Sequence, residues 1–196
     1  CDVFNKILLE NCHVKGGEIA GAHFTGGLIG YAAGWSETGT LTINNCSVKD
    51  ATVTGKGSCG GIIGHANGGK GLVEINTISV FSNTIASTGT DTNKAGSVMG
   101  TVGSATVKVT NCSVIDNEVT SNNVANAKLW GRQGSSTGVL YVDGVQVEDF
   151  GTFTPSTTVT VTNDEELAKA IEVNEVEVIK LAAGTYSENI VLTVAA

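Results

Sequence analysis

The chain has 196 residues, enough for one or two domains, and 41% of them are hydrophobic, which excludes a disordered chain without a core. The formal net charge is −8 and no cluster of Lys or Arg opposes it, so nucleic acid and anionic membrane surfaces are poor partners. No apolar run approaches the ~20 residues of a membrane span, so we expect no membrane insertion.

One spacing of apolar residues recurs along most of the chain. In its clearest copy the apolar side chains are Leu41, Ile43, Cys46, Val48 and Val53. The five copies start 32 to 34 residues apart, at Ile7, Leu41, Val73, Val107 and Leu140. The fifth copy lacks only its last position, and it continues through Val142, Val145 and Val147. A fixed period of this length indicates a solenoid, a propeller or another array.

The spacing inside each copy predicts strands and no helix. Apolar residues two apart are the period of a strand with one buried face. The single step of three falls at Asn44-Asn45, and Asn is common at corners because it tolerates left-handed backbone. Helical repeats are thereby excluded, and a propeller blade would need four antiparallel strands. We therefore predict an all-β fold, a parallel β-helix with one coil per ~33-residue repeat.

Each of the first four copies carries a glycine-rich stretch, or its remnant, at the same phase of the repeat. The stretches are Gly26-Gly-Leu-Ile-Gly30, Gly60-Gly-Ile-Ile-Gly64, Gly96-Ser-Val-Met-Gly100 and Ala127-Lys-Leu-Trp-Gly131. We interpret these glycines as tight corners, where backbone with positive φ costs glycine nothing.

Gly-Gly-Leu-Ile-Gly stretches followed by Asn-Cys-Ser-Val strands resemble the GLUG-motif repeats of bacterial surface proteins. Such repeats occur in adhesin-like proteins and beside the peptidase domains of some IgA-cleaving proteases. The resemblance covers residues 6 to 150 and implies a right-handed parallel β-helix outside the cell. Copies three and four depart from the motif at Ser97, Ala127 and Lys128.

The pattern changes after residue 152, so we divide the chain into repeats at 1–152 and a β-α-β appendage at 153–196. Asn163 followed by three acids predicts a helix N-terminus with a capping box. The stretch from Glu166 to Tyr186 resembles the segment that opens pectin-lyase-like β-helices, where a helix caps the N-terminal end. Here the helix either closes the first stack from its C-terminal end or opens a second one. The resemblance favours the second role, with further β-helix beyond Ala196.

Cysteines occupy one inward position of three copies, at Cys12, Cys46 and Cys112, and Ile78 fills it in another. A position that accepts Ile is hydrophobic, and a free Cys behaves there as a small hydrophobe. We favour free thiols, although coils ~4.8 Å apart leave a Cys12–Cys46 disulfide open. Neither Cys-x-x-Cys pairs nor clustered His are present, so we expect no metal and no cofactor. The same alternation places Ser79 on the outer face, where a charge should be tolerated.

Catalysis on a β-helix requires carboxylates or a base that project from neighbouring coils into one groove. Asp50 and Asp116 share a repeat phase, but Ser82 in the intervening copy separates them. We therefore predict no catalytic residues.

Three aromatic residues lie within or just after the glycine stretches, where a ring near a groove can stack on a sugar. These candidate ligand-binding residues are Trp35, Tyr31 and Trp130. With the resemblance, they favour a monomeric, non-enzymatic extracellular adhesin or stalk module of a bacterial surface protein, whose partner is a glycan or a host or cell-surface protein. The alternatives are a passive spacer and a carbohydrate-active enzyme of the pectin-lyase-like group.

Overall fold

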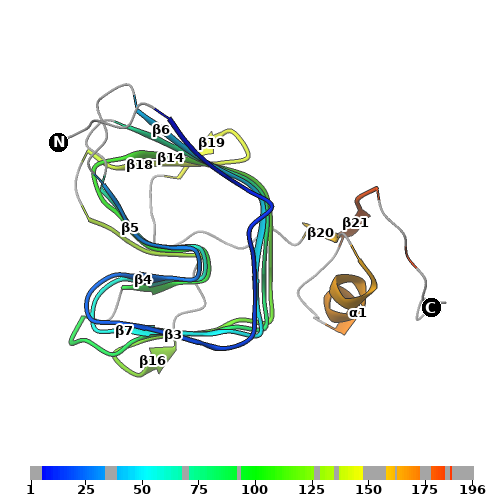
Figure 1. The fold of residues 1–196 in the computed structure, drawn as a ribbon, viewed down its shortest axis with the longest axis horizontal. Coiled ribbons are helices and arrows are strands. Elements are labelled where there is room, and N and C mark those ends of the chain that lie inside the picture. Colours follow the sequence, from blue (N-terminus) through cyan, green and yellow to red (C-terminus); the bar gives the residue numbers. More distant parts are fainter. Residues whose placement is uncertain are drawn as a thin grey trace.

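The strands form a parallel β-solenoid of about four turns in a computed structural model of the chain. The structure describes residues 6–33, 39–67, 71–91, 94–125, 129–134, 137–147, 158–161, 163–172, 178–183 and 186. Figure 1 looks along the stack, so that successive coils overlie one another and a small C-terminal unit stands beside them.

The strands of the stack form four sheets, and each of the first three coils contributes to all four of them. The largest sheet contains β1 (Lys6–Glu10), β2 (His13–Lys15), β6 (Thr40–Lys49), β10 (Leu72–Phe81), β14 (Thr106–Ile115), β18 (Val139–Val142) and β19 (Val145–Gln146). The second contains β3 (Glu18–Gly21), β7 (Thr52–Gly55), β11 (Thr84–Ser87), β15 (Glu118–Ser121) and β16 (Val124–Ala125). The third contains β4 (Thr25–Gly26), β8 (Cys59–Gly60) and β12 (Ala95–Gly96), and the fourth β5 (Ile29–Ala33), β9 (Ile63–Asn67), β13 (Met99–Val102) and β17 (Trp130–Gln133).

The register of these strands confirms the repeat. The five predicted starts lie side by side in successive coils, in the order Ile7, Leu41, Val73, Val107 and Leu140. Ile78 pairs with Cys46 on one side and Cys112 on the other, and Cys46 and Ile78 are each 1% exposed. The period of the sequence is therefore the spacing of the coils.

The predicted Asn corner is also confirmed. The corner residues have left-handed backbone, with φ of 55° at Asn11, 48° at Asn45, 52° at Thr77 and 52° at Asn111. Two of these side chains form a hydrogen bond between successive coils, in which Asn45 Nδ2 donates to Asn11 Oδ1 at 2.6 Å. Asn therefore serves both the turn and the contact between coils.

The glycine stretches do not have the predicted positive φ; in the described residues only Gly16, Gly17 and Gly144 do among the glycines. Instead the chain folds inward at these stretches, and β4 lies against β5 inside the coil (Figure 1). A Cβ on Gly60 would meet the Ile63 carbonyl oxygen and lie 2.8 Å from the Gly100 nitrogen. Glycine is required here because two backbones approach too closely for a side chain.

The inward fold divides the interior into two cores. The larger core lies between the first and fourth sheets and includes Ile43, Ile75, Met99 and Trp130. The smaller core lies between the second and third sheets and consists of Val53, Cys59, Ile85, Ala95 and Val119, with Ile19 packed against them.

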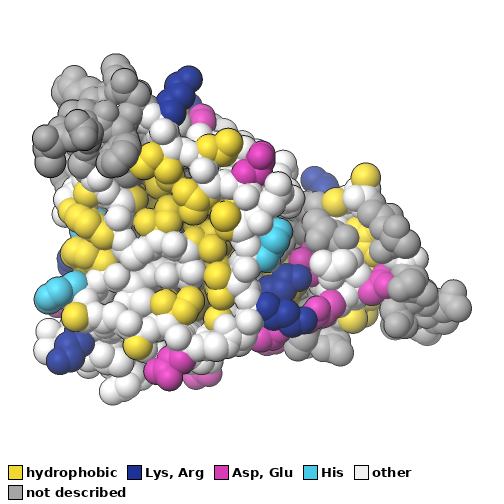
Figure 2. All heavy atoms as spheres, viewed as in Figure 1, with side chains coloured by type: hydrophobic (Ala, Val, Ile, Leu, Met, Phe, Trp, Pro, Cys, Tyr) yellow, Lys and Arg dark blue, Asp and Glu magenta, His cyan; other side chains and the backbone are white. Residues whose placement is uncertain are grey.

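The two ends of the stack differ. Most core residues of the first coil, such as Ile7, Leu9 and Ile29, are only partly buried, and Figure 2 shows apolar side chains across that end. At the other end β16 pairs antiparallel with β15, and β19 pairs antiparallel with β18. Short antiparallel strands of this kind cover the edges of a sheet.

The predicted fifth copy is therefore wrong after Val142. Asp143 and Gly144 turn the chain with φ of 48° and 84°, and the following strand reverses direction. Val145, expected to point inward, is 70% exposed. The apolar spacing fits both a hairpin and a continued fifth coil. Asp-Gly strongly favours a two-residue hairpin turn, and this preference decides the path of the chain.

The C-terminal unit consists of β20 (Thr158–Val161), α1 (Asp164–Glu172) and β21 (Val178–Leu181), with the two strands parallel. Asn163 Oδ1 accepts a hydrogen bond from the Glu166 backbone N–H at 3.0 Å, which confirms the predicted N-cap. In the described part of the chain, no helix has both the length and the apolar character needed to cross a bilayer.

The unit packs against the side of the stack, on the outer face of the first sheet. Its expected role in opening a second stack stays a prediction. One outward position holds Lys15, Lys49, Phe81 and Ile115 in four successive coils. Val161 and Ala170 of the unit cover Phe81 and Ile115. Glu165 and Glu166 pair with Lys15 and Lys49, at 3.5 Å and 2.8 Å.

This docking corrects the expectation for Ser79. The residue points outward as predicted, but it is only 9% exposed because it lies in a hollow beneath the unit. A charge at Ser79 would therefore be partly buried, and an exposed residue such as Thr84 makes the better control.

Ile78→Asp should unfold the stack, because an unpaired carboxylate inside the core costs at least several kcal/mol. Thr84→Asp places the same charge on the exposed face of β11 and should change the melting temperature little. Thermal unfolding followed by circular dichroism measures both. Equal losses in the two variants would show that Ile78 does not point inward.

Gly60→Ala should destabilise the protein by more than the ~1–2 kcal/mol that a left-handed alanine costs. Gly17→Ala supplies that reference, because Gly17 has φ of 87° and its Cβ would meet nothing within 4 Å. Urea unfolding of the two variants gives the comparison. If Gly60→Ala is the milder change, close backbone approach is not the reason for glycine.

Candidate functional site

The structure places Tyr31 in an exposed aromatic pair. Tyr31 lies on β5 and is 47% exposed, and Phe24 immediately precedes β4 and is 39% exposed. Because the chain folds inward between them, the two rings stack with centroids 4.8 Å apart and planes 21° apart. The pair therefore lies at the outer mouth of the inward fold.

A third ring from the next coil supports this pair. His65 is the register partner of Tyr31 and meets the rings of Phe24 and Tyr31 edge-on, at 4.7 and 5.4 Å. Asn67 Nδ2 donates a hydrogen bond to the Tyr31 hydroxyl at 3.1 Å. We call Phe24, Tyr31 and His65 the aromatic cluster.

The cluster carries little charge at neutral pH. Burial lowers the pKa of His65, and the nearby Arg132 guanidinium lowers it further. Neither ring nitrogen of His65 has a hydrogen-bond partner among the described residues. The neutral imidazole is therefore the favoured form, and the exposed surface is aromatic with one phenolic hydroxyl.

The other predicted ligand-binding residues are not part of this cluster. Trp130 is 1% exposed and packs inside the larger core beside Met99 of the preceding coil, so its ring is not available to a ligand and this prediction is wrong. Trp35 lies outside the described residues. Sequence reasoning missed Phe24 and His65. His65 was detectable, because it lies one repeat after Tyr31.

The carboxylates considered for catalysis lie at a second left-handed corner. Asp50, Ser82 and Asp116 have φ of 52°, 48° and 53°. Ser82 lies between the two acids along the stack, and its hydroxyl donates to Asp116 Oδ2 at 3.0 Å. These residues form a structural ladder at a turn.

Asp91 pairs with Lys94 and lies 3.7 Å from Arg132 Nη1, and these cations hold the pKa of its carboxyl below the usual range. Within the described ranges, no group of three His, Cys, Asp or Glu residues is arranged to hold a metal ion.

The described cysteines are free thiols, so Cys12 and Cys46 are not bridged. Cys46 donates to the Asn44 carbonyl at 3.1 Å. Burial raises the pKa of Cys59 to about 11 and also raises that of Cys112. Because the thiolate is the reactive form, these cysteines serve packing.

Comparisons with known proteins found no relative. A scan against protein-family models matched none of them, and searches of curated proteins and of solved structures found no match.

Lowering the pH should destabilise the protein through His65. The pKa of His65 is lower in the folded chain than its ordinary value of 6.5, so the unfolded state takes up the proton more readily. The contribution of this residue to stability is therefore full above 6.5 and declines as the pH falls below it. His65→Phe should lose less stability than the wild type between pH 7.5 and pH 5, measured by urea unfolding. Equal losses would show that His65 does not titrate as a buried group.

Proposed function

We propose that this protein is a non-catalytic binding module of a bacterial cell-surface or secreted protein, and that the aromatic cluster holds a glycan. The observation that carries the proposal is the exposed Phe24–Tyr31 pair, fixed by contacts from the next coil. Single exposed apolar residues are common on protein surfaces, but two stacked rings held by neighbouring side chains form a preorganised apolar surface.

The chemistry of the pair suits a sugar ring. One face of a pyranose is made of C–H groups, which pack on an aromatic face, while its hydroxyls remain in water or bond to a neighbour such as the Tyr31 hydroxyl. Because Asn67 and His65 hold the rings in place, little side-chain freedom is lost on binding. The net charge of −8 and the neutral His65 favour a neutral glycan over an acidic one.

The scaffold supports the same function. The first three coils pair with one another along four sheets, which makes a stiff array on which a small binding surface is held in a fixed position. The resemblance of the glycine stretches to GLUG-motif repeats is the argument for placement at or outside the cell surface and for the adhesin or stalk role.

Tyr31→Ala and Phe24→Ala should each weaken glycan binding by about tenfold, which corresponds to about 1.4 kcal/mol. Leu8→Ala is the matched control, because Leu8 is 60% exposed on β1 and lies outside the cluster. A glycan array identifies the ligand, and titration calorimetry measures the affinities.

Two outcomes would contradict the proposal. Equal glycan binding by Tyr31→Ala, Phe24→Ala and Leu8→Ala would show that the aromatic cluster is not the binding site. Binding to a protein partner and to no glycan would show that the ligand is not a glycan. A third outcome would show that the protein is a carbohydrate-active enzyme and not a non-catalytic module. It is the release of new reducing ends or unsaturated uronate products from pectin or polygalacturonate, with or without calcium.

A further inference from the structure

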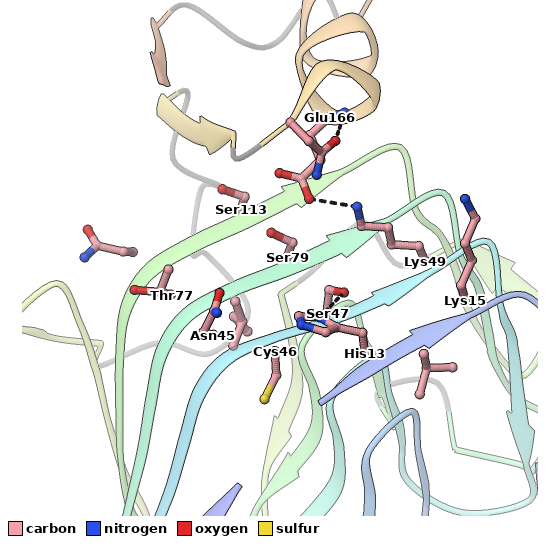
Figure 3. Close-up of a pocket in the computed structure, with 14 residues that line it drawn as sticks. His13, Lys15, Asn45, Cys46, Ser47, Lys49, Thr77, Ser79, Ser113 and Glu166 are labelled. Carbon is pink, nitrogen blue, oxygen red and sulfur yellow. Dashed lines mark hydrogen bonds and ion pairs between the residues drawn. The ribbon is translucent and has the colours of Figure 1, made fainter. Parts of the chain in front are cut away.

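The hollow that covers Ser79 is a groove between the side of the stack and the start of α1. It encloses about 280 Å³ and is lined by strands of the first four coils and by Asn163 and Glu166. In Figure 3 the helix lies above the strands, and Glu166 reaches down to Lys49. The aromatic cluster, beside β4 and β5, is on the opposite side of the coil in Figure 1.

The floor of this groove is a column of polar side chains. Successive coils place His13, Ser47, Ser79 and Ser113 side by side, one residue from each coil. The column lies two residues before the one on which the C-terminal unit docks, so the unit forms a wall beside it. The column therefore presents three hydroxyls and one imidazole to the hollow.

One residue of the column, Ser79, is mostly buried, yet its hydroxyl faces the hollow. Ser79 is only 9% exposed, points toward the helix in Figure 3 and makes no hydrogen bond with any described residue. Its neighbour Ser47 instead lies 2.9 Å from His13 Nδ1. The hydroxyl oxygen of Ser79 is not one of the fully buried polar atoms, so it is open to the hollow and can both donate to and accept from an occupant there.

The charges around the groove are already paired. Lys49 and Glu166 are 14% and 3% exposed and lie 2.8 Å apart, and Lys15 pairs with Glu165 at 3.5 Å. The first turn of α1 also carries Asp164, so a bound anion would meet three acids at the helix N-terminus. The groove therefore does not suit a carboxylate, sulfate or phosphate.

The remaining polar groups are hydroxyls, amides and one imidazole. Asn45 and Asn111 line the rim beside the serines. Serine hydroxyls and primary amides both donate and accept hydrogen bonds, as do the hydroxyls of a sugar. The volume is just below the ~300–1,000 Å³ of sites for drug-sized ligands, which leaves room for one sugar ring.

We propose that this groove is a binding site for one neutral hexose, with Ser79, Ser47 and His13 bonding its hydroxyls. The site is separate from the aromatic cluster and does not depend on it. If both sites bind sugars, the module holds a glycan at two points on opposite sides of the stack.

The test is a titration of the ¹⁵N-labelled full chain with D-glucose, D-galactose and D-mannose, each in a separate experiment. We expect one of these hexoses to give saturable shifts in the backbone amides of Ser47, Ser79 and Ser113. Ser79→Ala should weaken that binding about fivefold, the usual effect of one lost hydrogen bond, without lowering the melting temperature. His13→Ala should weaken it as well, and this exposed residue can be changed without disturbing the core. Thr84→Ala and Tyr31→Ala should leave it unchanged.

Several results would overturn the inference. They are the absence of saturable shifts in the groove with all three hexoses, unaltered affinity in both Ser79→Ala and His13→Ala, and tighter binding of D-galacturonate than of D-galactose. Shifts confined to the residues around Tyr31 and His65 would support the proposed function while removing the groove as a sugar site. A groove filled by water alone gives the first of these results.

Discussion

Backbone hydrogen bonds between successive coils are the interaction on which the rest of this structure depends. Because each strand pairs in parallel with the equivalent strand of the next coil, every residue lies beside the residues one repeat before and after it. Side chains at equivalent positions of successive coils therefore form columns along the stack. An inward column is either apolar, as Cys46, Ile78 and Cys112 are, or hydrogen-bonded to backbone groups, as the buried Ser87 and Ser121 are. An outward column is free to differ, and both candidate sites lie on outward faces.

The inward fold adds a second constraint inside each coil. Where β4 lies against β5, the distance between backbones excludes a Cβ, so glycine recurs at the same phase for a packing reason. The same fold brings together Phe24, just before β4, and Tyr31 on β5 of the same coil. The next coil then contributes His65 and Asn67 from one strand. The inward fold of one coil therefore brings the two exposed rings together, and side chains from the next coil hold them in place.

The C-terminal unit shows how a column can determine docking. Along the stack the column changes from Lys15 and Lys49 to Phe81 and Ile115, and the unit meets it with acids and apolar residues in the same order. A buried ion pair such as Lys49–Glu166 repays little more than its own desolvation. Apolar burial therefore supplies most of the attraction, and the ion pair fixes the position along the stack. The adjoining polar column then lies beneath the unit.

The sequence by itself determined the period, the register, the Asn corners and the helix N-cap. Each depends on local spacing or on the backbone preference of one residue type, as at Asn45 and Asn163. The tertiary structure alone decided that Trp130 is buried, that Ser79 is covered and that Val145 turns outward. Alternation indicates which face of a strand a side chain occupies, but it carries no information about what packs on that face. That depends on the path of other segments, and it is the reason the aromatic cluster and the groove required the structure.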